Sequence, residues 1–168
     1  MKIFGREITT KKQPFIIAEI SANHNNSMTR TLKIIKEAKK VGAHAIKLQS
    51  YDANSMTLNS NNKFFLIKDK KSLWYKKNLY DLYKKAALPY SWYKEIFAEA
   101  KKNDIICFST PFDENAVDYL DNYNVPAYKI ASFENNHTLL LEKVIKKKKP
   151  LIISLGATTK REINYLYN

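Results

Sequence analysis

The stretch Ala127-Tyr128-Lys129-Ile130-Ala131-Ser132-Phe133-Glu134 decides how the rest of this sequence is interpreted. Its apolar residues predict a buried β-strand, yet a lysine stands in the middle, and a serine and a glutamate come before the polar run that begins at Asn135. Burying an ammonium group costs several kcal/mol unless a counter-charge is supplied. Lys129 therefore predicts an anion close to this strand.

Two earlier apolar stretches show the same anomaly. The predicted strand 15–21 carries Glu19, and the predicted strand 45–50 carries Lys47 and Gln49. Because successive side chains of a strand alternate between its faces, each strand has one small or ionisable face and one aliphatic face. An open doubly wound sheet needs two apolar faces, whereas a (β/α)8 barrel admits polar groups inside, near its C-terminal mouth. The pattern favours a barrel.

Strand-like and helix-like segments alternate along the whole chain. We expect a hairpin lead-in over residues 1–14 and β/α units over residues 15–168. The predicted strands are 15–21, 45–50, 105–109, 127–132 and 151–155. The predicted helices run from Ser27 to Gly42, over 78–88, 90–102, 114–122 and 138–147, and onward from Thr158 or Thr159. Connections of this length join parallel strands by right-handed crossovers.

The predicted fold class is therefore α/β, and specifically the N-terminal part of a TIM (β/α)8 barrel. Such a barrel needs eight strands and about 250 residues, whereas this chain of 168 residues supplies five strands. We expect either the first five β/α units of a longer protein or a small open sheet. The connection 51–89 is far longer than usual between a strand and a helix, which is typical of a functional insertion.

Composition narrows the function classes. With 45% apolar and 12% aromatic residues the chain is expected to fold. Its one cysteine, Cys107, lies in an apolar run, so a reducing, cytoplasmic setting is expected, and no segment has the roughly 20 apolar residues of a membrane span. The net charge of +13 suggests a nucleic-acid-binding module. Only three residues are arginine and no nucleic-acid-binding motif is present, so we expect no nucleic-acid partner.

At this point the motifs resemble a known family. Five motifs, one on each predicted strand, follow one another in the order Ala18-Glu19-Ile20-Ser21-Ala22-Asn23-His24, Lys47-Leu48-Gln49, Phe108-Ser109-Thr110-Pro111-Phe112, Tyr128 to Glu134, and Ser154-Leu155-Gly156. This series of motifs resembles the N-terminal barrel of the sialic acid synthases. The segments 21–24, 49–51, 79–83 and 131–134 are more similar to the pseudaminic branch than to the N-acetylneuraminate or legionaminate branches.

The resemblance implies a reaction and a set of roles. Such enzymes condense phosphoenolpyruvate with an acetamido sugar, in the pseudaminic branch a 2,4-diacetamido-2,4,6-trideoxy hexose, giving a nonulosonic acid and phosphate. The predicted catalytic residues are Glu134, Glu19 and Lys129. The predicted substrate-binding residues are Lys47, Gln49, Asn23, Ser132, Ser154 and Gly156. Backbone amides near Gly156 and Ala157, expected at the start of the last helix, are further candidate phosphate donors.

The resemblance also implies parts that we do not expect within these 168 residues. The full-length enzymes use Mn²⁺ or Mg²⁺ held by histidines on later strands, carry a small C-terminal antifreeze-like domain, and are expected to form homodimers. We therefore expect no metal ligands within these residues, no membrane partner, and no turnover by this chain alone. An inactive fragment is the alternative.

Several residues have a simpler interpretation. A lysine and a glutamate on neighbouring strands can form a structural ion pair inside a barrel. His24 can face solvent or the site, the role of His137 stays open, and Asp113 is as well suited to cap a helix as to bind sugar. The segment 79–83 can pack or can form a lid.

Overall fold

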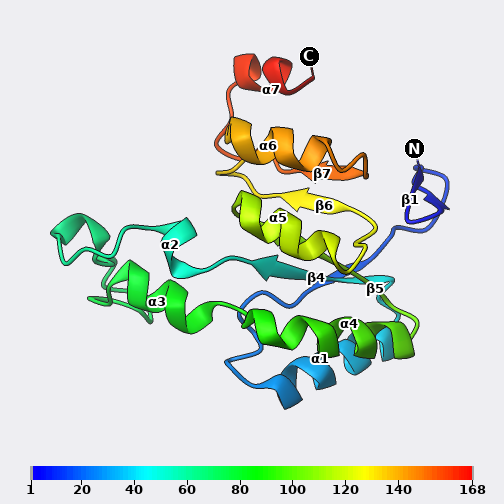
Figure 1. The fold of residues 1–168 in the computed structure, drawn as a ribbon, viewed down its shortest axis with the longest axis horizontal. Coiled ribbons are helices and arrows are strands. Elements are labelled where there is room, and N and C mark those ends of the chain that lie inside the picture. Colours follow the sequence, from blue (N-terminus) through cyan, green and yellow to red (C-terminus); the bar gives the residue numbers. More distant parts are fainter. Residues whose placement is uncertain (1, 168) are drawn as a thin grey trace.

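The computed structural model describes residues 2–167, and these residues form a half-barrel. Five parallel strands lie side by side in the order β3-β4-β5-β6-β7. Because neighbours in the sheet are also neighbours along the chain, the order never reverses as it does in a doubly wound sheet. The helices α1, α4, α5, α6 and α7 follow one another across the sheet (Figure 1). The prediction of the N-terminal part of a (β/α)8 barrel is confirmed.

The strands are short, and the helices range from about one turn in α2 to between three and four turns in α1. The strands are β1 (Lys2–Ile3), β2 (Arg6–Glu7), β3 (Ile17–Glu19), β4 (Ala45–Ser50), β5 (Ile106–Pro111), β6 (Tyr128–Ile130) and β7 (Leu151–Ile153). The α-helices are α1 (Met28–Lys40), α2 (Ala53–Met56), α3 (Leu79–Ala86), α4 (Tyr93–Lys102), α5 (Glu114–Asp121), α6 (Thr138–Ile145) and α7 (Lys160–Tyr167). Two 3-10 turns cover Lys63–Phe65 and Tyr90–Trp92. No helix among these residues is long and apolar enough to cross a membrane.

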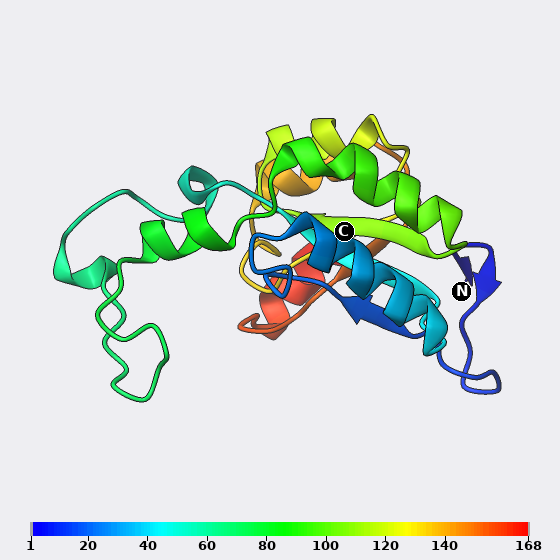
Figure 2. The same cartoon turned by 90° about the horizontal axis from the view of Figure 1, so that it is seen from below.

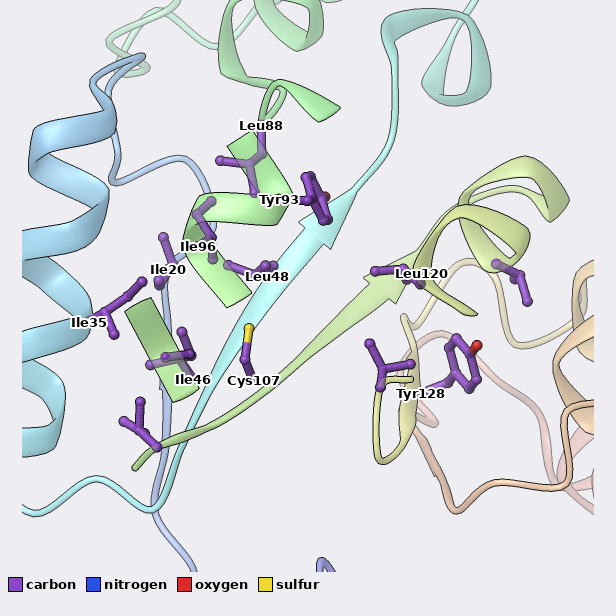
Figure 3. Close-up of a cluster of buried hydrophobic side chains, with 14 of the residues drawn as sticks. Ile20, Ile35, Ile46, Leu48, Leu88, Tyr93, Ile96, Cys107, Leu120 and Tyr128 are labelled. Carbon is purple, nitrogen blue, oxygen red and sulfur yellow. The ribbon is translucent and has the colours of Figure 1, made fainter. Parts of the chain in front are cut away.

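The helix-facing side of the sheet holds the core. Ile46 and Leu48 of β4, Cys107 of β5 and Tyr128 of β6 point toward side chains from the helices, such as Ile35 of α1 (Figure 3). These strand residues alternate with the polar ones, as the period of two requires. Burial raises the pKa of the Cys107 thiol, so this cysteine is a packed, unreactive group.

The N-terminal hairpin covers the end of the sheet where the strands begin. Its turn residues Phe4 and Gly5 have φ of 55° and 75°, the left-handed values that join two-residue hairpins. The Phe4 ring contacts Phe15 at 5.3 Å and Phe108 at 5.2 Å between ring centroids. Phe108 is thereby fully buried although it lies on the inner face of the sheet. The hairpin thus leaves the opposite, C-terminal end of the strands as the open end.

Local signals place the helix ends where the sequence predicts them. The Ser27 hydroxyl accepts the Arg30 amide at 3.3 Å and caps α1. Gly42 follows the helix with φ of 89°, and the next amide, of Ala43, donates to the carbonyl of Ala38 at 2.9 Å. Asp113 accepts the Ala116 amide at 2.7 Å, which identifies it as the cap of α5.

Only the predicted strand 45–50 has both of its expected ends, because β3, β6 and β7 are each shorter than the predicted strands 15–21, 127–132 and 151–155, and the third strand is shifted toward its C-terminus. We expected the third strand to end at residue 109, but β5 continues through Thr110 to Pro111, which pair with Gln49 and Ser50. Proline is tolerated here because it is the last residue of the strand, and the next amide, of Phe112, donates to the Ser50 carbonyl at 3.2 Å. The extension moves Thr110 from a turn into the sheet.

The connection 51–89, called the arm below, projects beyond the C-terminal ends of the strands (Figures 1 and 2). It contains α2, a 3-10 turn and α3, joined by a hairpin-like loop in which Leu66 bridges Asn78. Tyr51 at its base packs edge-on against Tyr83 of α3 and against Phe112. The arm is therefore anchored by aromatic contacts while its outer loop is exposed.

Candidate active site

The polar strand residues lie together on the inner face of the half-barrel. In the sheet register Glu19 is opposite Lys47, and Gln49 is opposite Thr110. Lys129 lies on the same side, because its neighbour Tyr128 points into the core on the other side. Four of the residues that the sequence singles out thus share one face, near the open end.

Glu19 and Lys47 form an ion pair on this face. The Lys47 ammonium also donates to the Thr110 hydroxyl at 3.2 Å, and its side chain is 15% exposed. Glu19 is 41% exposed and accepts the Ser21 amide at 3.0 Å. The Ser21 hydroxyl donates to Gln49 at 2.7 Å, which links the pair to Gln49. The contacts of Glu19 and Lys47 therefore fit the simpler interpretation, a structural ion pair inside the barrel.

Lys129 is held differently, by neutral acceptors. Its ammonium donates to the Ile130 carbonyl at 2.6 Å and to the Ser154 hydroxyl. Burial lowers the pKa of Lys129, and the nearby Lys47 lowers it further, against the opposing effect of Glu19 and Glu134. Lys129 is thus a partly desolvated cation that forms no direct ion pair within residues 2–167 and lies close to a second cation.

Glu134 is the carboxylate with the least hydrogen bonding in this region. Its Oε2 is buried and has no hydrogen-bond partner among the described residues. Burial raises the pKa of Glu134, while its own backbone amide, His137 and Lys129 oppose the rise. A raised pKa makes this carboxylate a stronger base and a group that takes up a proton more readily than an exposed glutamate.

The loops after β6 and β7 are tied together closely. A Cβ added at Gly156 would stand 2.7 Å from the Ser132 hydroxyl oxygen, so a glycine is needed for this close approach. The side-chain amide of Asn135 donates to the Ser154 carbonyl at 3.0 Å and to the Thr158 hydroxyl. Asn135 is buried, and it fixes the loop that carries two predicted site residues.

Other predicted residues lie apart from this cluster. Asn23 is exposed in the loop after β3, where its backbone amide donates to the Ile20 carbonyl at 2.9 Å, and within residues 2–167 no side-chain hydrogen bond joins it to the cluster. His24 is fully buried: Nδ1 accepts the Asn26 amide at 3.0 Å and Nε2 contacts the Ala86 carbonyl at 3.2 Å. This histidine joins the loop to α3 and does not face solvent. His137 precedes α6 without capping it through its side chain.

The last helix begins within two residues of the predicted start at Thr158 or Thr159, but after the two amides that we assigned to its N-terminus. We placed the amides of Gly156 and Ala157 at its N-terminus, but α7 begins at Lys160. Thr159 and Glu162 fix that start, because the Glu162 carboxylate accepts both the amide and the hydroxyl of Thr159 at 2.7 Å. The prediction is wrong on this point, and the helix N-terminus cannot be assigned to those two amides.

The sequence analysis named Thr110 and Asn135 but gave neither a role in the site. The role of Thr110 could have been predicted by extending the strand beyond residue 109, because side chains alternate between the two faces and Thr110 then shares the inner face with Phe108. Asn135 gave no such signal, since an asparagine after a strand usually indicates only a turn. Within residues 2–167 no three histidine, cysteine, aspartate or glutamate side chains gather as a metal site would require.

A family model described as the NeuB family matches residues 34–168. This chain belongs to the NeuB family. The suspected resemblance to sialic acid synthases is thereby confirmed at the level of the family.

Relatives in the NeuB family include two pseudaminic acid synthases. The chain is 48% identical over 154 residues to that of Campylobacter jejuni subsp. jejuni serotype O:2 and 43% identical over 150 residues to that of Helicobacter pylori. These alignments cover 92% and 89% of this chain but 44% of each relative. The chain thus spans less than half the length of the relatives that it matches.

A solved structure shows the same architecture. The half-barrel superposes on the crystal structure of an N-acetylneuraminic acid synthetase from Leptospira borgpetersenii, solved in complex with citrate, with a TM-score of 0.82 at 26% identity. The match covers 99% of this chain and 53% of that chain. The five-stranded sheet with its helices therefore corresponds to part of a larger synthetase of known structure.

Proposed function

We propose that this chain is the N-terminal part of a pseudaminic acid synthase, which condenses phosphoenolpyruvate with a 2,4-diacetamido-2,4,6-trideoxy hexose. The observation that carries the proposal is the pair of ammonium groups on one inner face, of which Lys129 is partly desolvated and has no direct ion pair among the described residues. The identity of 48% and 43% to two pseudaminic acid synthases supports this branch. The N-acetylneuraminate and legionaminate branches are the alternatives.

The cations suit a small, doubly anionic substrate. Phosphoenolpyruvate brings a phosphate and a carboxylate, and fixed positive charges in a partly dry site stabilise both groups. Lys129 and Lys47 repel each other across the inner face, and an anion between them would relieve that repulsion. The Ser154 hydroxyl lies beside the Lys129 ammonium, and the Ser132 hydroxyl lies beside Gly156. Both hydroxyls can donate hydrogen bonds to phosphate oxygens.

The carboxylates suit the proton steps of this reaction. Carbon 3 of the enol attacks the sugar aldehyde, water adds to carbon 2, and phosphate leaves by cleavage of the carbon–oxygen bond. We assign Glu134 to taking the proton of that water, because its buried carboxylate has a raised pKa. Glu19, with Gln49 beside it, is assigned to the sugar hydroxyls and to balancing Lys47. Asn23 completes this proposed set from the loop after β3.

The residues described do not supply a metal site, so no step is assigned to a metal here. For the intact protein we propose that histidines beyond these 168 residues hold Mn²⁺ or Mg²⁺. A dimer and the small C-terminal domain belong to the same proposal. None of these parts is needed for the roles given above to the inner-face lysines and carboxylates.

A chimera tests the proposed function directly. Residues 1–168 are joined to the part of the Campylobacter jejuni synthase that lies beyond the matched region, and phosphate release from phosphoenolpyruvate is measured with rival acetamido sugars. We expect release with the 2,4-diacetamido sugar, and a loss of at least tenfold in Lys129→Met relative to the surface control Lys84→Met. A folded chimera that releases no phosphate with any of the sugars would refute the proposal.

A further inference from the structure

A second concave site lies at the base of the arm. A cavity of about 650 Å³ opens between the loop after β3, which contributes Ala22 and Asn25, and the arm, which contributes α3 and part of the preceding loop. This volume falls within the roughly 300–1,000 Å³ that is typical of small-molecule sites. None of the predicted catalytic or substrate-binding residues lines it. The cavity is therefore separate from the inner-face cluster.

The charged groups around this cavity have no ion-pair partners within residues 2–167. Lys77 and Lys85 line it and form neither ion pairs nor side-chain hydrogen bonds there. Asp81 stands one helical turn before Lys85 on α3, a spacing that commonly pairs such residues, yet these two are not paired. Three lysines and one aspartate give the lining a positive balance, which favours an anionic ligand.

One wall of the cavity is aromatic. Trp74 lines it, is 49% exposed, and makes no ring contact with another aromatic residue of the described chain. Leu66 and Leu82 extend the apolar surface beside it. A free indole face next to cations is suited to a planar ring that stacks, joined to a group that carries negative charge.

We propose that this cavity binds a nucleoside phosphate, with the base stacked on Trp74 and the phosphate near Lys77 and Lys85. The proposed substrates of the inner-face site fit less well, because phosphoenolpyruvate has no ring and an acetamido sugar has no charge. A long single strand of nucleic acid is disfavoured, because the site is a bounded cavity and the arm contains no arginine. The proposal does not depend on the proposed synthase reaction.

The cavity contacts the loop that leads from β3. Ala22 and Asn25, which line the cavity, flank Asn23 and His24. The Ala86 carbonyl, which contacts the His24 ring at 3.2 Å, belongs to another lining residue. A nucleotide held here therefore rests on the loop that presents Asn23.

Calorimetric titration with adenosine 5′-monophosphate tests the site without any assay of activity. We expect the parent chain to bind adenosine 5′-monophosphate, and to bind adenosine alone or inorganic phosphate alone at least tenfold more weakly. Trp74→Leu should weaken binding about tenfold or more, since it keeps apolar bulk but removes the stacking face. Lys85→Met should weaken it several-fold, whereas Lys84→Met, an exposed neighbour outside the lining, should stay within about twofold.

Far-ultraviolet circular dichroism checks that each variant is folded, and the same titrations in the chimera serve if the half-barrel is unstable alone. No binding of the nucleotide at millimolar concentration overturns the proposal, as does equal binding of inorganic phosphate. Equal losses in Lys85→Met and Lys84→Met also overturn it. An oligonucleotide that binds far more tightly than the mononucleotide and is insensitive to Trp74→Leu would indicate a nucleic-acid surface instead.

Discussion

Replacing Asn135 by alanine should destabilise the chain more than its position in a turn suggests. The buried amide donates to the Ser154 carbonyl at 3.0 Å and to the Thr158 hydroxyl, and the Gly156 carbonyl stands at 3.5 Å, the limit of a hydrogen bond. Two lost bonds at about 0.5–1.5 kcal/mol each predict a loss of about 2 kcal/mol. In a chain of this size that corresponds to a fall in Tm of roughly 4–8 °C.

The assay is urea unfolding followed by circular dichroism, with Asn136→Ala as the matched control. Asn136 is the same residue type at the next position and is exposed, so its replacement should change the free energy of unfolding by less than about 0.5 kcal/mol. If the two variants were equally stable, the hydrogen bonds of Asn135 would not hold the two loops together. That result would refute the reasoning.

The variant Asn135→Asp adds a pH test of the same contact. An ionised aspartate cannot donate to the Ser154 carbonyl, whereas a protonated one can. Burial should raise the pKa of this carboxyl in the folded state above its unfolded value of about 3.9. The stability of the Asn135→Asp variant should therefore be nearest to that of the parent below about pH 3.9, where the carboxyl is protonated in both states. It should fall as the pH rises through the folded-state pKa. A pH-independent difference would contradict this expectation.

Three further predictions concern other buried groups. Because burial raises the pKa of Glu134, urea unfolding should show Glu134→Gln to be more stable than the parent at pH 7. This advantage should vanish below the unfolded pKa of about 4.3, and an advantage that persists there would contradict the assignment. Burial lowers the pKa of His24, so the parent should lose stability as the pH falls below about 6.5, and thermal unfolding of His24→Gln should lack that loss. Tyr93→Phe should lower the free energy of unfolding in urea by about 1 kcal/mol, because the Tyr93 hydroxyl is hydrogen-bonded to the Ser50 hydroxyl at 2.6 Å. Tyr90→Phe should lower it less, because the Tyr90 hydroxyl makes no hydrogen bond in the described chain.

Much of the candidate site could be predicted because strands have a strict period of two. That period placed Glu19, Lys47 and Gln49 on one face, and the structure brings these three together. The interloop contacts could not be predicted in the same way. Asn135 joins residues about 20 positions apart, and neither end of that contact has a distinctive local pattern.

The sequence by itself determined the order of the strands and helices, the ends of α1 and α5, and the family, because caps, turns and hydrophobic periods act over a few residues. Only the tertiary structure decided that His24 is buried, that Lys129 has neutral partners, and that Trp74 lines a cavity whose lysines form no ion pairs within residues 2–167. Each of these depends on which distant segments pack together. Desolvation and charge pairing are set by such neighbours and not by position along the chain.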